Sequence, residues 1–277
     1  MRGPRALALP FLGGVLVLVA LPAIAALVLA FTEYSGVQGP RFTGLDNIER
    51  LVSDKAFWRA LGNSLVYVAI SVPLRVGLAV ACALLLARRT RGVRAARAAV
   101  YLPTVVPDVA YALLWLWLLN PLYGPLALLG AGNALVEPWG ARLALPVIAA
   151  FQIGEAFVVA LAARRAVPGP LYEAASLEGA SPWYVTRRLT LPLMAPVIGV
   201  LLMRDVVVAL HTNFVPAMIL TDGGPRDATT YLSLYVYRTA FRYFRLGYAS
   251  TIALAIFLFT ALAIYAQYRI VKRWRAT

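Results

Sequence analysis

Residues 173–192 read EAASLEGASPWYVTRRLTLP, a polar stretch that lies between two long apolar runs. Its beginning predicts a short helix over residues 171–178, because alanine favours helices and Gly179 can adopt the left-handed conformation that ends one. Ser181 can cap a second helix whose first residue is Pro182. The stretch is therefore predicted to fold as helix, turn and helix, built from polar and small residues.

The chain has six apolar runs, four before this stretch and two after it. Hydrophobic residues make up 61% of the 277-residue chain and charged residues only 14%, which is unusual for a soluble domain. A helix needs about 20 apolar residues to cross the hydrocarbon core of a bilayer. The predicted fold class is therefore an all-α integral membrane protein with six transmembrane helices, near residues 6–31, 60–87, 98–119, 143–163, 197–220 and 247–268.

A single membrane domain is expected over residues 1–277, because no linker or repeat divides the chain. Its core covers about residues 60–271, its first span about 6–31, and the loop with the polar stretch about 168–196. Pro192 and Pro196 are expected to limit the second short helix before the next span. A secretory signal peptide is the alternative for residues 6–31, although the apolar core of such peptides is only about 7 to 15 residues long.

The basic residues are distributed unevenly between the two sides of the membrane. With the N-terminus inside, the inner segments hold 15 basic and two acidic residues, whereas the outer segments hold nine basic and seven acidic ones. The positive-inside rule then predicts that both termini and residues 173–192 face the cytoplasm. The net charge of +14 therefore indicates contact with anionic membrane lipids and not with nucleic acid.

Catalytic and metal-binding patterns are absent from the sequence. Cys82 is the only cysteine and His211 the only histidine, so that clusters of these residues for zinc, copper or haem are excluded. Neither of the two lysines, Lys55 and Lys272, follows a phosphate-binding loop of the GxxxxGK[ST] type. We therefore expect neither an enzyme nor a bound cofactor, and nucleotide energy would have to come from another polypeptide.

The polar stretch resembles the cytoplasmic EAA loop of binding-protein-dependent ABC importer permeases. The matching positions are Glu173, Ala174, Ala175, Gly179, Leu191 and Pro192, while Leu189 replaces an isoleucine and Glu178 stands where aspartate is frequent. Residues 163–169 are more basic than the usual approach to this motif. The resemblance implies a loop that docks on cytoplasmic ATPases through Glu173, Ala174, Ala175, Leu177, Glu178, Gly179, Ala180 and Pro192.

Other stretches resemble the carbohydrate branch of that family. FTGLDNIERL at residues 42–51, Asn63 and LTDGGPRDATTYL at residues 220–232 are similar to the first permease of maltose-type and glycerol-phosphate-type sugar importers. This resemblance implies one half of a translocation pathway for a sugar or polyol, in the plasma (inner) membrane of a bacterium or archaeon. The implied partners are a second homologous permease, two ATPases that use ATP and magnesium, and an extracytoplasmic solute-binding protein, for which residues 221–225 are a candidate contact.

Five charged residues interrupt the apolar runs: Arg75, Asp108, Glu155, Arg204 and Asp205. At about 1.5 Å per helical residue, the three carboxylates lie about 13 to 16 Å from the inner ends of their spans, near the middle of the membrane. Charges at this depth are costly and usually face protein or water. One interpretation is a structural network in which Arg75 and Arg204 pair with carboxylates of other spans.

A substrate path is the second interpretation, because a sugar is bound by carboxylates, amides and aromatic faces. Its candidate residues are Asp108, Glu155, Asp205, His211, Asn213 and Phe214. The same three carboxylates could instead relay protons in a proton-coupled secondary transporter. The EAA-like loop makes that alternative the weaker one.

An aromatic and basic segment covers residues 231–248, where tyrosines and phenylalanines are interleaved with Arg238, Arg242 and Arg245. Such a segment is typical of a membrane interface, where aromatic rings and long arginine side chains meet the headgroups. A contact surface for a partner outside the cell is the alternative.

Overall fold

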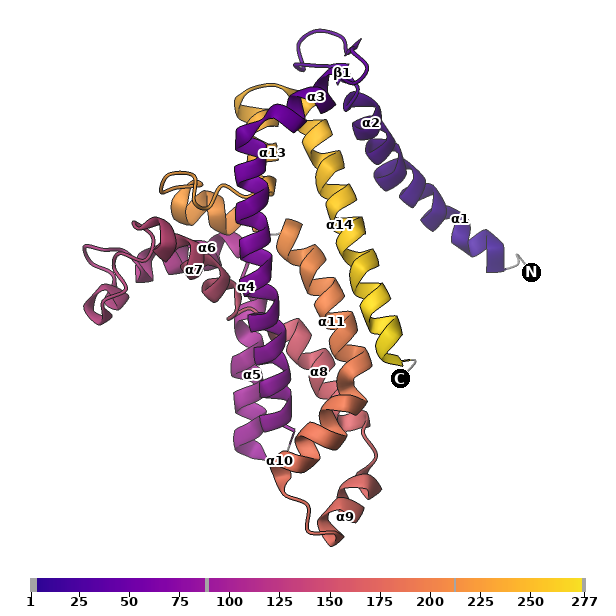
Figure 1. Cartoon of the computed structure of the whole chain (residues 1–277), viewed down its shortest axis with the longest axis vertical. Coiled ribbons are helices and arrows are strands. Elements are labelled where there is room, and N and C mark those ends of the chain that lie inside the picture. Colours follow the sequence, from indigo (N-terminus) through magenta and orange to yellow (C-terminus); the bar gives the residue numbers. More distant parts are fainter. Residues whose placement is uncertain (1–3, 88–89, 212, 276–277) are drawn as a thin grey trace. The chain divides into compact units, whose positions relative to one another are not determined.

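The computed structural model describes residues 4–87, 90–211 and 213–275, and it is almost entirely helical (Figure 1). Its contacts divide the chain into two compact units. Unit 1 comprises Met1–Arg59 and Leu232–Phe259, and unit 2 comprises Ala60–Tyr231 and Thr260–Thr277. Two long helices, α4 (Lys55–Leu85) and α14 (Leu246–Arg275), contribute residues to both units.

Unit 1 combines an apolar helical segment with a small polar cap. Its elements, besides the beginnings of α4 and α14, are α1 (Pro4–Val15), the π-helical turn η1 (Leu16–Ala20), α2 (Leu21–Leu29), β1 (Thr32–Glu33), β2 (Arg41–Phe42), α3 (Asp46–Ser53), α13 (Leu232–Tyr237) and the π-helical turn η5 (Arg238–Arg242). The two strands pair antiparallel, with Thr32 opposite Phe42.

Close backbone contacts hold the cap of unit 1 together. The Asn47 side-chain amide donates hydrogen bonds to the carbonyl oxygens of Ala30 (3.1 Å) and Thr32 (2.9 Å). A Cβ atom at Gly247 would lie 2.0 Å from the Thr32 oxygen, so only glycine fits there. The Thr251 hydroxyl also donates to the Ala30 oxygen, at 2.8 Å. These contacts fix the start of α14 against the end of α2.

Unit 2 holds most of the remaining helices. They are α5 (Arg91–Val105), α6 (Asp108–Leu118), the 3₁₀ turn η2 (Pro125–Leu129), α7 (Pro138–Ala149), α8 (Gly154–Ala166), α9 (Gly169–Leu177), α10 (Pro182–Val185), the π-helical turn η3 (Thr186–Thr190), α11 (Leu191–His211), α12 (Phe214–Pro216) and the π-helical turn η4 (Ala217–Thr221). Helix α4 buries Val72, Val76, Ala79 and Ala83, which share one helical stripe.

Among the residues that the structure describes, four helical segments are long and apolar enough to cross a membrane: Pro10–Leu29, Lys55–Leu85, Pro182–Thr221 and Leu246–Arg269. Two bent helix pairs raise the number of candidate spans among the described residues to six if each pair is one span. Within Pro10–Leu29 no residue is buried, although the segment is apolar on all sides. Such a surface suits lipid or a partner subunit and not water. The chain is thus a helical membrane protein with four to six candidate spans.

The expectation of a straight helix over residues 98–119 is wrong. Gly92–Val105 and Asp108–Leu118 meet at an angle of 102°. Val106 is extended, with ψ of 127°, because the residue before a proline is disfavoured in the helical conformation, and here Pro107 follows. The depth calculated for Asp108 along one straight helix is therefore wrong as well. The run 143–163 is also bent, by 50° between α7 and α8.

The expectation that Pro192 and Pro196 limit the second short helix is also wrong. The helical segment continues from Pro182 through α10, η3 and α11 to His211 and contains both prolines. The π-helical turn η3 directly precedes α11, whose second residue is Pro192. A proline removes one backbone donor and crowds the preceding turn, and a change from α- to π-helical bonding at that place accommodates it.

Candidate functional site

The polar loop has a defined shape that its own residues produce. Helix α9 ends at Leu177, and Gly179, two residues further on, has a φ of +69°, which is the left-handed conformation. The Gly179 N–H donates to Ser176 O (3.1 Å) and the Ala180 N–H to Ala175 O (3.0 Å), a pair of bonds that satisfies the last carbonyls of the helix. Ser181 then caps α10, because its hydroxyl accepts a bond from the Tyr184 N–H at 3.3 Å. The predicted helix, turn and helix is confirmed.

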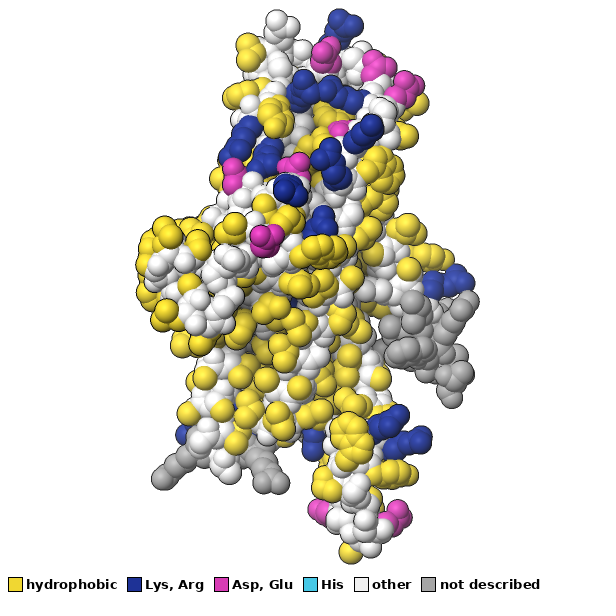
Figure 2. Space-filling model, turned by 60° about the vertical axis from the view of Figure 1, so that its left-hand side comes forward, with side chains coloured by type: hydrophobic (Ala, Val, Ile, Leu, Met, Phe, Trp, Pro, Cys, Tyr) yellow, Lys and Arg dark blue, Asp and Glu magenta, His cyan; other side chains and the backbone are white. Residues whose placement is uncertain are grey.

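This loop presents acidic, small and apolar side chains together. Glu173, Ala174 and Glu178 are exposed, and the Leu177 side chain is 89% exposed. Of the other predicted docking residues, Pro192 is exposed while Ala175 and Ala180 are half-buried. Figure 2 shows acidic side chains at the tip of the segment that carries α9, with hydrophobic side chains beside them. The loop thus exposes acidic and apolar side chains next to one another.

Tyr172 connects the loop to two neighbouring helices, and the sequence analysis missed it. Its hydroxyl lies 3.0 Å from the Thr190 hydroxyl in η3, and the Arg164 guanidinium of α8 stacks over its ring at 4.4 Å. The only sequence signal was its position directly before Glu173. Tyr172 thus joins α9 to α8 and to the turn that precedes α11 through direct contacts.

A chain of charges runs between three helices of unit 2. Asp205 in α11 is buried, and its Oδ1 lies 3.5 Å from Arg75 Nη1 of α4 and 3.9 Å from Arg204 Nη1. Arg204 forms an ion pair with Glu155 of α8. Arg75 also donates to the Gln152 carbonyl oxygen at 3.3 Å. The charge of the buried Asp205 carboxylate is thereby compensated by two arginines, as the interior of a membrane protein requires.

The two ends of this charge chain differ in exposure. The Arg75 and Asp205 side chains are 12% and 1% exposed, whereas those of Arg204 and Glu155 are 40% and 58% exposed. The buried end has the surroundings of a structural pair. The exposed end has room for contact with a solute or another subunit.

Among the described residues, no ion pair links the remaining candidate path residues to this chain of charges. Asp108 is exposed at the first residue of α6, and no ion pair among the described residues includes it. His211 is exposed at the end of α11, Asn213 is buried, and Phe214 is half-buried at the start of α12. The geometry thus brings Arg75, Glu155, Arg204 and Asp205 together and leaves the roles of all these residues as predictions.

Asn63 holds the loop that contains residues 221–230. Its side-chain amide donates to the Asp227 oxygen at 2.7 Å and to the Thr230 oxygen at 3.3 Å. Arg142 Nη2 donates in turn to Asn63 Oδ1 at 3.2 Å. The loop therefore has a fixed shape, set by a residue more than 150 positions earlier in the chain.

Comparison with known proteins identifies the family. Residues 74–276 match the family described as "Binding-protein-dependent transport system inner membrane component". The chain belongs to this family. As a member of the binding-protein-dependent permeases, it is a transport subunit located in the inner membrane and not an enzyme, and its transport depends on a binding protein.

Individual members of the family align over almost the whole chain. The chain is 32% identical over 278 residues to the "Probable ABC transporter permease protein YesP" of Bacillus subtilis, covering 96% of this chain and 89% of the relative. It is 33% identical over 277 residues to the "Trehalose/maltose transport system permease protein MalF" of Thermococcus litoralis, covering 96% and 92%.

A solved structure shows the same fold. A chain of a bacterial alginate ABC transporter, crystallised in complex with an alginate pentasaccharide-bound periplasmic protein, superposes with a TM-score of 0.82 at 25% sequence identity. The alignment covers 97% of this chain and 93% of that chain. The helical architecture is therefore that of an ABC importer permease.

Proposed function

We propose that this permease forms one half of the translocation pathway of an ATP-driven importer for a sugar or a related polyol. The names of its relatives support the substrate class, since they include a trehalose/maltose permease and an alginate transporter. In this proposal the chain crosses the membrane six times, with both termini and residues 168–196 in the cytoplasm. The other half of the pathway is a second, homologous permease.

The shape of the polar loop carries the proposal. Glu173, Ala174 and Leu177 form an exposed surface on α9 that fits a groove on a cytoplasmic ATPase. Two ATPases bind ATP and magnesium, whereas this chain binds no cofactor. Because Tyr172 contacts both η3 and α8, closure of the ATPase pair would move α8 and α11 together.

On the outer side, the solute-binding protein would deliver the sugar. Residues 221–225 belong to the loop that Asn63 and Arg142 hold, so they offer a preformed contact. Inside the membrane, Glu155 and Arg204 are the exposed pair that a hydroxylated solute could reach, and Asp205 with Arg75 supports them. Asp108, His211, Asn213 and Phe214 stay candidates for the same path.

Transport in proteoliposomes tests this function. The chain, its second permease and its ATPases are reconstituted together, and uptake of labelled mono- and disaccharides is measured with the binding protein present. We expect uptake only when two conditions are met. ATP must be present on the side of the membrane that carries the ATPases, and the binding protein must be present on the opposite side. Uptake driven by a pH gradient alone would instead support a proton-coupled secondary transporter and contradict the proposal.

A further inference from the structure

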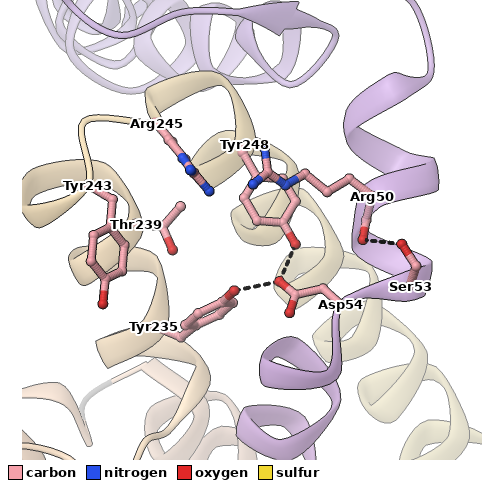
Figure 3. Close-up of a pocket in the computed structure, with 8 residues that line it drawn as sticks. All are labelled: Arg50, Ser53, Asp54, Tyr235, Thr239, Tyr243, Arg245 and Tyr248. Atoms are coloured by element: carbon pink, nitrogen blue, oxygen red, sulfur yellow. Dashed lines mark hydrogen bonds between the residues drawn. The ribbon is translucent and has the colours of Figure 1, made fainter.

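A cavity of about 320 Å³ lies in the polar cap of unit 1 and has no place in the transport mechanism described above. Its walls come from α3, the junction of α3 and α4, α13, η5 and the start of α14 (Figure 3). The residues that matter for its chemistry are Arg50, Asp54, Tyr235, Thr239, Arg245 and Tyr248.

Both oxygens of the Asp54 carboxylate in this wall accept hydrogen bonds from the protein itself. Its Oδ2 accepts hydrogen bonds from the hydroxyls of Tyr235 and Tyr248, both at 2.5 Å (Figure 3). Its Oδ1 accepts from the backbone N–H groups of Ala56 (2.8 Å) and Phe57 (3.4 Å). The Asp54 oxygens and the two tyrosine hydroxyl protons are therefore already hydrogen-bonded to one another, and they are not available to bind a ligand.

Two arginines face the cavity, and neither forms an ion pair with a carboxylate among the described residues. The Arg50 guanidinium lies over the Tyr248 ring, 4.8 Å from its centre, and Arg245 extends into the cavity (Figure 3). Two guanidinium groups and one carboxylate leave a surplus of one positive charge. The beginning of the long helix α14, directly after Arg245, adds a favourable dipole for an anion.

The Thr239 hydroxyl is the decisive feature of the cavity. Thr239 is 2% exposed, and its Oγ1 has no hydrogen-bond partner within the described structure. Buried hydroxyls are nearly always hydrogen-bonded, so an unpaired one indicates a missing partner. Thr239 is fixed beside Arg245, because the Arg245 N–H donates to the Thr239 carbonyl oxygen at 3.0 Å. Thr239 and Arg245 also line the same cavity, so a partner of the hydroxyl in that cavity can meet the Arg245 guanidinium as well.

We infer that this cavity binds a phosphate group, supplied either by the headgroup of an anionic phospholipid or by free inorganic phosphate. A phosphate presents oxygens in several directions, which matches donors on Arg50, Arg245 and Thr239 better than the two coplanar oxygens of a carboxylate do. A phosphodiester carries one negative charge, which equals the surplus charge of the cavity.

The surroundings of the cavity favour a lipid as the source. Tyr243 and Phe244, beside Arg245, are 59% and 62% exposed, and aromatic side chains of this kind are enriched where protein meets lipid headgroups. An adjoining cavity of about 370 Å³ shares Arg50 and Arg245 but is also lined by Glu33 and Asp46. These acids make the adjoining cavity unfavourable for an anion, so the phosphate group belongs beside Thr239.

Binding to the full-length chain in neutral detergent tests this inference, independently of transport. Native mass spectrometry measures binding of short-chain phosphatidylglycerol, with diacylglycerol as the phosphate-free control, and equilibrium dialysis measures binding of labelled inorganic phosphate. Arg245→Gln is expected to lower the affinity for the phosphate-containing probe about tenfold, which is the effect of losing one charge-assisted hydrogen bond. Arg245→Lys should recover part of that loss. Thr239→Val, which keeps the side-chain shape, should also weaken binding, whereas Thr239→Ser should not.

Arg41→Gln is the matched control, because Arg41 is an exposed arginine of the same unit outside the cavity. Loss of phosphatidylglycerol binding in the Arg245 and Thr239 variants identifies a lipid source, and the same loss for inorganic phosphate identifies a free one. If both probes bind the Arg245→Gln chain as they bind the wild type, the inference is wrong. It is equally wrong if diacylglycerol binds as tightly as phosphatidylglycerol and inorganic phosphate does not bind. Unchanged thermal unfolding of the variants shows that they are folded.

Discussion

At the scale of single residues, Gly179 sets the direction of the chain after α9. Its φ is +69°, and a Cβ placed there would have no atom within 4 Å. A larger residue at this position is therefore disfavoured by the positive φ of the backbone and not by steric crowding. Gly169, the first residue of the same helix, also has open space around it but lacks a positive φ.

We predict that Gly179→Val weakens ATPase association while the chain still inserts into the membrane. A β-branched residue in the left-handed region is strained by about 1–2 kcal/mol, so the turn would change its direction. Co-purification of the ATPases with the tagged permease measures the effect. Gly179→Asn, which tolerates this conformation, and Gly169→Val are the controls and should retain the partner. ATPase yield at the wild-type level with Gly179→Val would contradict the prediction.

At the scale of elements, Asp54 joins four of them in unit 1. It follows α3, caps the start of α4 through the Ala56 and Phe57 N–H groups, and accepts bonds from Tyr235 of α13 and Tyr248 of α14. Burial raises the pKa of the Asp54 carboxyl, but these hydrogen bonds outweigh it, so that the pKa lies below its ordinary value of 3.8. The carboxylate is thus ionised at neutral pH and holds the helix ends together.

Asp54→Asn is expected to lower the stability of the chain by about 2 kcal/mol at neutral pH, the scale of a hydrogen bond to a charged group. Asparagine caps helices well, so the loss reports mainly the two tyrosine contacts. Because the folded pKa is lowered, the advantage of the wild type is full above the ordinary pKa and disappears as the pH falls through the folded value. Thermal unfolding of the wild type and of Asp54→Asn, at neutral pH and at a pH below the folded pKa of Asp54, measures this difference in stability. Glu49→Gln, an exposed change in α3, is the control and should leave the stability at neutral pH unchanged.

At the scale of the whole molecule, charge distribution is expected to determine orientation. The predicted inner segments carry 15 basic and two acidic residues. Moving them across the membrane is opposed by the positive-inside rule. Cys82 is the only cysteine of the chain, so single cysteines can be introduced into a Cys82→Ser background without interference.

Orientation is therefore testable with a membrane-impermeant maleimide. We predict that Ser35→Cys is labelled in cells with an intact inner membrane and that Ser176→Cys is labelled only in inverted vesicles. Both serines are exposed in the structure, so a difference in labelling reports the side of the membrane and not burial. Labelling of the Ser176→Cys chain from the outside would reverse the proposed topology.

Local features of this chain were predictable from sequence. Gly179 and Ser181 form their turn and cap through neighbours a few residues away, and the motif around Glu173 led to the family that residues 74–276 confirm. The bend after Val105 was missed although Pro107 signalled it, because a count of apolar residues contains no direction. The prolines within α11 were misread for a related reason, since a π-helical turn accommodates what an α-helix does not.

By itself, the sequence determined the membrane class, the family and the shape of the loop at residues 173–192, because hydropathy, motif spacing and capping act between near neighbours. Only the tertiary structure decided which charges meet. Asp54 lies 181 and 194 residues from its tyrosine partners, and Arg75 reaches Asp205 from another helix. Contacts at such separation depend on how helices bend and pack, and no local pattern of residues encodes that.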